Sequence, residues 1–310
     1  RHWLDVSGYV DVYGSDNDAA IIKPLAEKWR FRDYVIRSFN EGKPFDRFIV
    51  EQLAGEELYD WKSADVFSEE MTDALIATGF LLCANDDTDQ NELNTPETRH
   101  HVLQRTTEVI ASNLLALTVQ CARCHDHKYE AFSQADYYCL ESVFAPAFNV
   151  RHWVTSTGHG RADVSDRQKE RIDHENGQID GRVAALKMQA DEIRERYRRT
   201  LFTEKLALLP ETIRSTVRTA LETSAEKRTA EQQRLAETHK AALTVSPQEL
   251  SAAPNEVDTK QLTDIAKQTA DLHSKRRTYR TIQIVHERNL PSPTYVLRRG
   301  NYLRPGLKVA

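Results

Sequence analysis

The chain has 310 residues, of which 40% are hydrophobic, and its 42 basic and 47 acidic residues leave a formal net charge of -5. This length allows two domains, or one domain with a large insertion, each with a real core. The balanced, slightly acidic charge argues against nucleic acid and against an anionic membrane surface as partners. No stretch approaches the roughly 20 apolar residues of a membrane span, so we expect no span in this chain.

The first third of the chain is predicted to be helical after an irregular start. After the opening residues 1–5, a segment rich in Gly, Asp, Ser and Asn continues through Asn17 with turn chemistry and little periodicity, which predicts a loop. Apolar residues at helical spacing then predict helices over residues 24–40, 44–55 and 69–80. Ser68 is the expected N-cap of the third helix.

The clearest helix follows these and is predicted to begin at Pro96, after the N-cap Thr95. Its apolar face continues without interruption, so we expect the helix to run straight into Cys121. After an irregular stretch, Ser133 is the expected cap of a further helix that stops before Pro146.

The stretch between these two helices, Cys121-Ala122-Arg123-Cys124-His125, has the spacing of covalent haem c attachment. The two thiols add across the vinyl groups on one porphyrin edge, and the adjacent imidazole becomes the proximal ligand of the iron. One alternative is a reduced or disulfide-bonded Cys-x-x-Cys beside an unrelated histidine. Another is a zinc site of Cys121, Cys124, His125 and His127, but four ligands within seven residues would strain the chain. Haem is therefore the favoured cofactor.

Two cysteines lie outside this motif. Cys83 and Cys139 each lie in an apolar helical stretch, so we expect both to be buried thiols, with a disulfide between them as the alternative.

Several runs of the sequence are similar to the planctomycete-type cytochrome c domain family. They are residues 1–5, 29–40, 43–48, 51–55, 117–129, 136–138, 293–297, 299–302 and 305–306. The resemblance implies a helical, cytochrome c-like haem domain whose biological role is poorly defined. In the family this domain usually stands between an upstream segment, often with a further cytochrome domain, and a downstream domain of unknown function. We therefore expect the chain to be the middle of a longer secreted protein.

The chain departs from the family pattern at two places. Glu130-Ala131-Phe132 replaces the usual Asp-Pro-hydrophobic run, and Gln120 stands where the family commonly has glycine. Neither departure affects a haem-attachment residue.

An electron carrier with low-spin iron needs a sixth ligand. His127 is excluded, because two residues of extended chain, about 7 Å, do not reach the opposite face of the haem from His125. His100 and His101 are disfavoured, because an unbroken helix would hold them roughly 30 Å from Cys121.

His2 is the expected sixth ligand. It lies in a run that matches the family, and an N-terminal loop is free to cross the open face of the haem. Met71 and His152 are the next candidates, and an open, five-coordinate iron is the remaining alternative. Arg123 is expected to pair with a haem propionate.

The composition shifts to Glu, Lys, Arg, Gln and Ala between residues 165 and 286, which predicts long solvated helices. Isoleucine or leucine recurs every seven residues from Ile172 to Ile193, the pattern of a coiled-coil seam. Pro210 breaks this run, and we expect residues 168–243 to form two long antiparallel helices. This arm is either a docking surface for a homo- or hetero-oligomer or a spacer packed on its own haem domain.

We thus expect a mainly α fold in three parts: a helical, cytochrome c-like haem domain over residues 1–160, an antiparallel coiled-coil or helical-hairpin insertion over residues 161–288, and a closing segment over residues 289–310 that leads to a downstream domain. The expected function is that of a c-type cytochrome domain, which exchanges electrons with a redox partner protein such as another cytochrome domain. No catalytic residue is assigned.

Haem c is attached outside the cytoplasm, so we expect a secretory signal before residue 1 and a periplasmic or otherwise extracytoplasmic location. The alternative function is a haem-dependent oxidoreductase with an open iron site, either peroxidase-like or acting on a carbohydrate-derived substrate. A third alternative is an interaction module in which the arm dominates.

Overall fold

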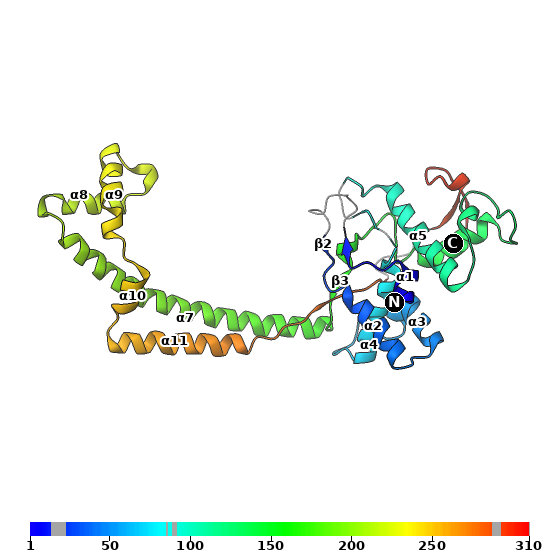
Figure 1. Cartoon of the computed structure of the whole chain (residues 1–310), viewed down its shortest axis with the longest axis horizontal. Helices are drawn as coiled ribbons and strands as arrows, with labels where there is room; N and C mark the ends of the chain where they lie inside the picture. Colours follow the sequence, from blue (N-terminus) through cyan, green and yellow to red (C-terminus); the bar gives the residue numbers. More distant parts are fainter. Residues whose placement is uncertain (14–22, 85, 89–91, 287–292, 310) are drawn as a thin grey trace. The chain divides into compact units, whose positions relative to one another are not determined.

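The structure is a computed structural model that describes residues 1–13, 23–84, 86–88, 92–286 and 293–309. These residues form eleven α-helices and three small antiparallel sheets of two strands each (Figure 1). The prediction of a mainly helical fold is therefore confirmed. The chain divides into two compact units, the first made of residues 1–170 and 279–310 and the second of residues 171–278. Among the described residues, no helix is long and apolar enough to span a membrane, as expected.

The described residues of the first unit form six complete α-helices, several short 3-10 turns and the strands of the three sheets. Its helices are α1 (His2–Ser7), α2 (Trp29–Asn40), α3 (Phe45–Ala54), α4 (Glu69–Ala77), α5 (Pro96–Leu114) and α6 (Gln134–Phe144). Its 3-10 turns are η1 (Gly55–Glu57), η2 (Thr78–Leu82), η3 (Gln120–Arg123), η4 (Ser156–His159) and η6 (Arg298–Gly300). Its strands pair as β1 (Val12–Tyr13) with β2 (Lys23–Pro24), β3 (Gly160–Ala162) with β4 (Thr281–Gln283), and β5 (Tyr295–Leu297) with β6 (Pro305–Lys308).

The start of the chain differs from the sequence-based expectation. Residues 2–7 form α1, which takes in the start of the expected loop, because Trp3 anchors them: its ring packs 5.0 Å from that of Phe48, and its Nε1 donates to Gln52 Oε1 at 2.8 Å. The end of the expected loop, residues 14–17, lies outside the described residues. The predicted helix from Pro24 begins only at Trp29. Glu27 has a left-handed φ of 58°, which an α-helix does not accommodate.

The other helix starts agree with the sequence, because hydroxyl side chains cap them as predicted. The Ser68 hydroxyl accepts from the Met71 N–H at 3.1 Å at the start of α4, and the Thr95 hydroxyl accepts from the Thr98 N–H at 3.2 Å at the start of α5. Ser133 forms a complete capping box at the start of α6. Each cap satisfies a backbone donor that the first turn of a helix leaves unpaired.

The main core of the first unit lies between α2, α3, α4 and η2. Tyr34 is fully buried at its centre, and its hydroxyl donates to Glu51 Oε2 at 2.7 Å. Lys43 and Arg47 both pair with the same carboxylate, so the buried charge of Glu51 is compensated.

The second unit is helical throughout. It contains most of α7 (Asp166–Ala207), followed by α8 (Glu211–Glu222), the 3-10 turn η5 (Ala225–Lys227), α9 (Ala230–Leu243), α10 (Pro247–Ala252) and α11 (Glu256–Ser274). The α7 helix confirms the long first helix of the predicted arm. The expected second long helix is wrong, because η5 divides residues 211–243 into α8 and α9, and these two helices share an apolar cluster with the end of α7.

The antiparallel partner of α7 is α11 instead. Ala190 and Ile193 pack against Ile265, and the Tyr197 hydroxyl and Arg196 both donate to Asp258 Oδ2, at 2.5 and 2.9 Å. The apolar seam that was predicted to face residues 211–243 thus faces a more distant helix. The coiled-coil geometry itself stays a prediction.

Candidate functional site

The chain reverses direction between α5 and the Cys-x-x-Cys-His motif, so the prediction that the helix runs into Cys121 is wrong. The α5 helix ends at Leu114, and the Ala111 carbonyl accepts from the N–H groups of Leu115 and Leu117 at 3.2 and 3.0 Å. Ala116 then has a left-handed φ of 55°, a conformation that terminates helices. The motif therefore folds back along α5 instead of extending beyond it.

Arg123 shows where the motif lies. Its Nη1 atom is 3.3 Å from Gln104 Oε1 and 3.8 Å from Glu108 Oε1, both in the middle of α5. This guanidinium is thus engaged by α5, and the expected contact with a propionate stays a prediction. Burial raises the pKa of Glu108, and the positive charge of Arg123 partly offsets that rise.

The motif itself forms one helical turn. The carbonyl of Cys121 accepts from the backbone N–H of Cys124 at 3.2 Å and from that of His125 at 3.4 Å. The two cysteines and the histidine therefore belong to one turn of the backbone. Neither cysteine is in a disulfide, and Cys121 and His125 are exposed while Cys124 is half-buried.

A backbone carbonyl orients the imidazole of His125. Its Nδ1 lies 2.7 Å from the carbonyl oxygen of Asp126. A carbonyl only accepts, so Nδ1 carries the proton and Nε2 keeps its lone pair for a metal. Asp126 is fixed in turn, because its Oδ1 accepts from the backbone N–H of Gln134 at 2.8 Å. The contact of His125 Nδ1 with the Asp126 carbonyl is the kind that orients histidine ligands in metalloproteins.

The first turns of α6 contact the backbone of the motif. The carbonyl of Arg123 accepts from Gln134 Nε2 and from the Tyr138 hydroxyl, both at 2.9 Å. Gln134 also donates to the carbonyl of Leu297 at 3.0 Å and so ties the motif to β5. Ala122 is fully buried in a cluster with Tyr138 and Leu297. Gln134 and Tyr138 were not predicted as site residues, although the cap at Ser133 already placed them four residues apart on one face of a helix.

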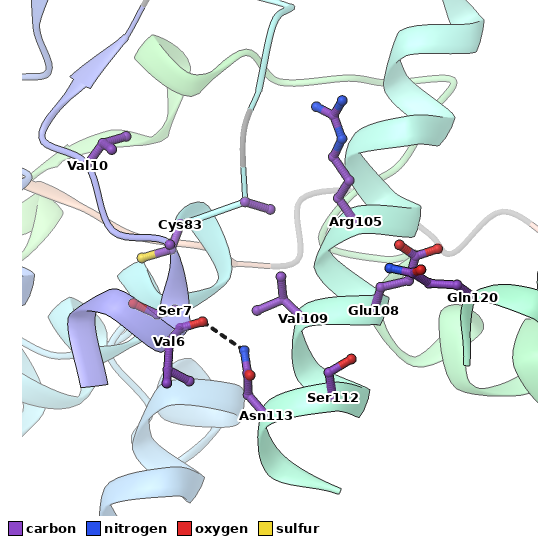
Figure 2. Close-up of a pocket in the computed structure, with 12 residues that line it drawn as sticks. Val6, Ser7, Val10, Cys83, Arg105, Glu108, Val109, Ser112, Asn113 and Gln120 are labelled. Carbon is purple, nitrogen blue, oxygen red and sulfur yellow. Dashed lines mark hydrogen bonds between the residues drawn. The ribbon is translucent and has the colours of Figure 1, made fainter. Parts of the chain in front are cut away.

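A cavity of about 470 Å³ adjoins the motif, between α1, the end of η2 and α5. Figure 2 shows Arg105 and Glu108 projecting from α5, with Gln120, the residue before Cys121, beside Glu108. Asn113 Nδ2 donates to the Val6 carbonyl at 2.8 Å and joins α1 to α5. The described lining residues are Val6, Ser7, Gly8, Val10, Cys83, Ala84, Arg105, Glu108, Val109, Ser112, Asn113 and Gln120. Its volume is within the ~300–1,000 Å³ of small-molecule and cofactor sites.

His127 is a structural residue of the loop after the motif. Its Nδ1 accepts from the Glu130 N–H at 2.9 Å, and its ring stacks on Phe132 at 4.7 Å. The described part of the chain contains no group of three His, Cys, Asp or Glu side chains arranged to hold a metal ion. The four candidate zinc ligands are therefore not gathered as a zinc site requires.

The candidate sixth ligands lie at different places in the first unit. His2 is exposed on α1, one helical turn before Val6 and on the same side as this cavity-lining residue. Met71 packs against the main core, and His152 is exposed. His101 is exposed, as expected.

His100 differs from the expectation of a surface residue far from the motif. It is half-buried, its ring stacks on Tyr302 at 5.5 Å, and it lies one turn before Gln104, the residue that Arg123 contacts. Burial lowers the pKa of His100.

The other two cysteines have different environments. Cys83 is buried, as predicted, and burial raises the pKa of its thiol to about 11. Cys139 is exposed, which corrects the expectation of a second buried thiol, and neither cysteine is in a disulfide.

Comparison with known proteins found one family model that is similar to part of the chain. Residues 1–148 match the model of a family described as PSCyt2, Protein of unknown function (DUF1549). This stretch contains the motif, the cavity beside it and α1 to α6. No curated protein and no solved structure matches the chain.

Proposed function

We propose that the first unit is a planctomycete-type c-type cytochrome domain that carries covalent haem and transfers electrons outside the cytoplasm. The observation that supports it best is the single backbone turn in which the Cys121 carbonyl accepts from the N–H groups of Cys124 and His125, with His125 Nδ1 on the Asp126 carbonyl. A match to a family of unknown function leaves the activity open, so the proposal rests on this geometry and on the spacing of the motif.

The residues of the motif fit the group they would hold. Cys121 and Cys124 are unpaired thiols that would form the two thioether bonds, and His125 would be the axial ligand. Asp126 and Gln134 would hold the imidazole in its ligating orientation. The haem, when bound, would supply one-electron redox chemistry. The protein would supply the axial ligand, the surrounding dielectric and the exposed edge through which a partner is reached.

The polar side of the neighbouring cavity supports one alternative function. Arg105 and Glu108 project into it from α5. Charged side chains near a haem with an open position would suit a peroxidase-like enzyme or an oxidoreductase acting on a carbohydrate-derived substrate, because distal polar groups decide between electron transfer and activation. His2 as sixth ligand would favour the carrier instead.

The proposal carries expectations for location and partners. Haem c attachment implies a periplasmic or otherwise extracytoplasmic protein and a redox partner protein, such as another cytochrome domain. The second unit, in which α7 packs against α11, would serve either as a docking arm for a partner or another protomer or as a spacer.

The proposal is tested by measuring whether haem is covalently attached to the chain. The full chain, exported behind a secretory signal in a bacterium with a cytochrome c maturation system, should keep a haem absorbance after extraction with acidified acetone. The Cys121→Ser, Cys124→Ser double variant should lose that absorbance. The matched control is Cys139→Ser, which removes an exposed thiol outside the motif and should keep it. Absent or fully extractable haem in the unaltered chain would refute the proposal.

A further inference from the structure

A polar cavity of about 470 Å³ lies in the first unit, between α2, α4, the residue after β3 and the residue before β4. It shares no described lining residue with the cavity of Figure 2. Its volume is within the ~300–1,000 Å³ of small-molecule sites. The question is which molecule its walls would bind.

Two arginine–aspartate pairs form the polar wall of this cavity. Arg30 Nη1 donates to Asp163 Oδ2 at 2.8 Å, and Asp163 Oδ1 accepts from the backbone N–H of Arg280 at 2.8 Å. Arg37 forms the second pair with Asp73. The four side chains of these pairs are between 18% and 43% exposed. A guanidinium has more donors, and a carboxylate more acceptor sites, than these contacts use, so both pairs can also bond a ligand.

The charges on the cavity balance. Its described lining residues include three arginines and four carboxylates, and Arg32, which is not a lining residue, pairs with the lining carboxylate of Asp33 at 3.0 Å. An ionic ligand would lose hydration on entry and find no excess of the opposite charge to compensate the loss. A neutral ligand with several hydroxyl groups can instead donate to the carboxylates and accept from the guanidinium groups.

Trp29 gives the cavity an aromatic side chain that the core does not use. It is half-buried at the start of α2, and it belongs to none of the apolar clusters of the described residues. Phe67 and Ile76 also line the cavity and pack in the main core. The walls therefore combine an apolar side that includes an indole with a set of fixed donors and acceptors.

We propose that this cavity binds a neutral saccharide, with a pyranose ring against Trp29 and its hydroxyl groups on the two arginine–aspartate pairs. A pyranose has C–H groups on its faces and hydroxyl groups around its rim, which matches an aromatic wall beside donors and acceptors. The ion pairs hold these groups in place before binding, so little order is lost when the ligand enters. The proposal is independent of haem attachment, because none of its residues belongs to the Cys-x-x-Cys-His motif.

Nuclear magnetic resonance of the ¹⁵N-labelled full chain tests it through the indole N–H signals of the four tryptophans. The probes are the methyl glycosides of glucose, galactose and mannose, and the Trp29 signal is assigned as the one that Trp29→Phe removes. We expect at least one glycoside to shift this signal in a saturable titration. The signals of Trp3 and Trp153, whose indole N–H groups donate to Gln52 and Thr88, should stay in place.

Four further compounds test the chemistry of the ligand. Glucuronate and glucosamine keep the pyranose ring but carry a charge, sorbitol has the hydroxyl groups without a ring, and adenosine replaces the second sugar feature, a hydroxylated face, with a planar base. Each should bind more weakly than the best methyl glycoside. A preference for any of the four would overturn the choice of a neutral saccharide.

Two variants test the residues. Arg37→Lys keeps the charge but loses the forked donors of the guanidinium, and it should weaken binding of the best glycoside at least tenfold. Its matched control is Arg194→Lys, because Arg194 pairs with Asp191 in the second unit and is 49% exposed, close to the 43% of Arg37. Trp29→Ala should also weaken binding at least tenfold. Absence of glycoside binding, binding that leaves the Trp29 signal in place, or an affinity indifferent to both Arg37→Lys and Trp29→Ala would each overturn the proposal.

Discussion

Gly300 lies directly against the sulfur of Cys124. Gly300 has a left-handed φ of 69°, and a Cβ atom at this position would be 2.9 Å from Cys124 Sγ and 3.6 Å from the Arg123 carbonyl oxygen. The closing segment therefore reaches back across about 175 residues of chain to contact one cysteine of the motif, and a side chain at position 300 would require the Cys124 sulfur to shift.

Gly300→Ala is predicted to destabilise the first unit and to displace Cys124. The left-handed conformation alone costs an alanine about 1–2 kcal/mol, and the contact with sulfur adds to that cost. The matched control is Gly42→Ala. Gly42 has a similar φ of 65°, but a Cβ atom at position 42 would have no neighbour within 4 Å, so this variant measures the cost of the backbone conformation alone. Urea unfolding should show a larger loss for Gly300→Ala, and equal losses would show that the contact with Cys124 is unimportant.

Ala116→Gly is predicted to stabilise the reversal that brings the motif back to α5. Ala116 has a φ of 55°, so its replacement by glycine removes a conformational strain of about 1–2 kcal/mol from the folded protein. Glycine also raises the conformational entropy of the unfolded chain, which offsets part of this gain. We expect a small net increase in the free energy of unfolding, measured by urea titration. The control Ala111→Gly, at a fully buried helical position, should lower it. A destabilised Ala116→Gly protein would contradict the strained conformation.

His2→Ala tests the sixth ligand and presupposes that haem is attached. The removal of an axial imidazole should convert a low-spin visible spectrum to high-spin and let carbon monoxide bind the reduced iron. His101→Ala, which removes an exposed histidine of α5, should leave the spectrum alone. An unchanged low-spin spectrum in His2→Ala would direct attention to Met71 and His152, and a native high-spin spectrum would favour the enzyme.

Glu141→Gln is predicted to flatten the pH dependence of stability. Burial raises the pKa of Glu141 from its ordinary value of 4.5 to about 8. Between these values the unfolded chain releases a proton that the folded protein keeps, so the native protein loses stability as pH rises, by at most about 1.4 kcal/mol per pH unit. Urea unfolding at pH 5 and pH 8 should show Glu141→Gln gaining on the unaltered protein as pH rises. If the difference in free energy of unfolding between the two proteins is the same at pH 5 and pH 8, the pKa of Glu141 is not raised in the folded protein.

Ile265→Ala is predicted to destabilise the second unit. Ile265 is buried between α11 and α7, and truncation of a buried isoleucine to alanine costs about 2–5 kcal/mol. Val257→Ala in the same helix is the control, because Val257 is 75% exposed. Thermal unfolding, monitored as loss of the helical circular dichroism signal, should occur at a lower temperature in Ile265→Ala than in the unaltered protein, and Val257→Ala should not lower it. A negligible effect would argue against the pairing of α7 with α11.

Local chemistry made several features predictable from the sequence alone. Ser68, Thr95 and Ser133 cap the helices that they were expected to cap, because the hydroxyl of an N-cap bonds a backbone donor only two or three residues away. The spacing of Cys121, Cys124 and His125 likewise requires no more than one turn of chain. The long helix α7 followed from its own apolar period and composition.

Tertiary structure alone decided how these elements meet. The period of α7 identified a seam but not its partner, because α11 and the segment of α8 and α9 both offer apolar faces. Likewise, the apolar pattern of α5 gave no sign of the left-handed Ala116 that ends the helix early. Gly300 on Cys124, Gln134 on the Arg123 carbonyl and the buried carboxyl of Glu141 arise from segments far apart in sequence. The sequence by itself determined the motif, and packing determined which groups surround it.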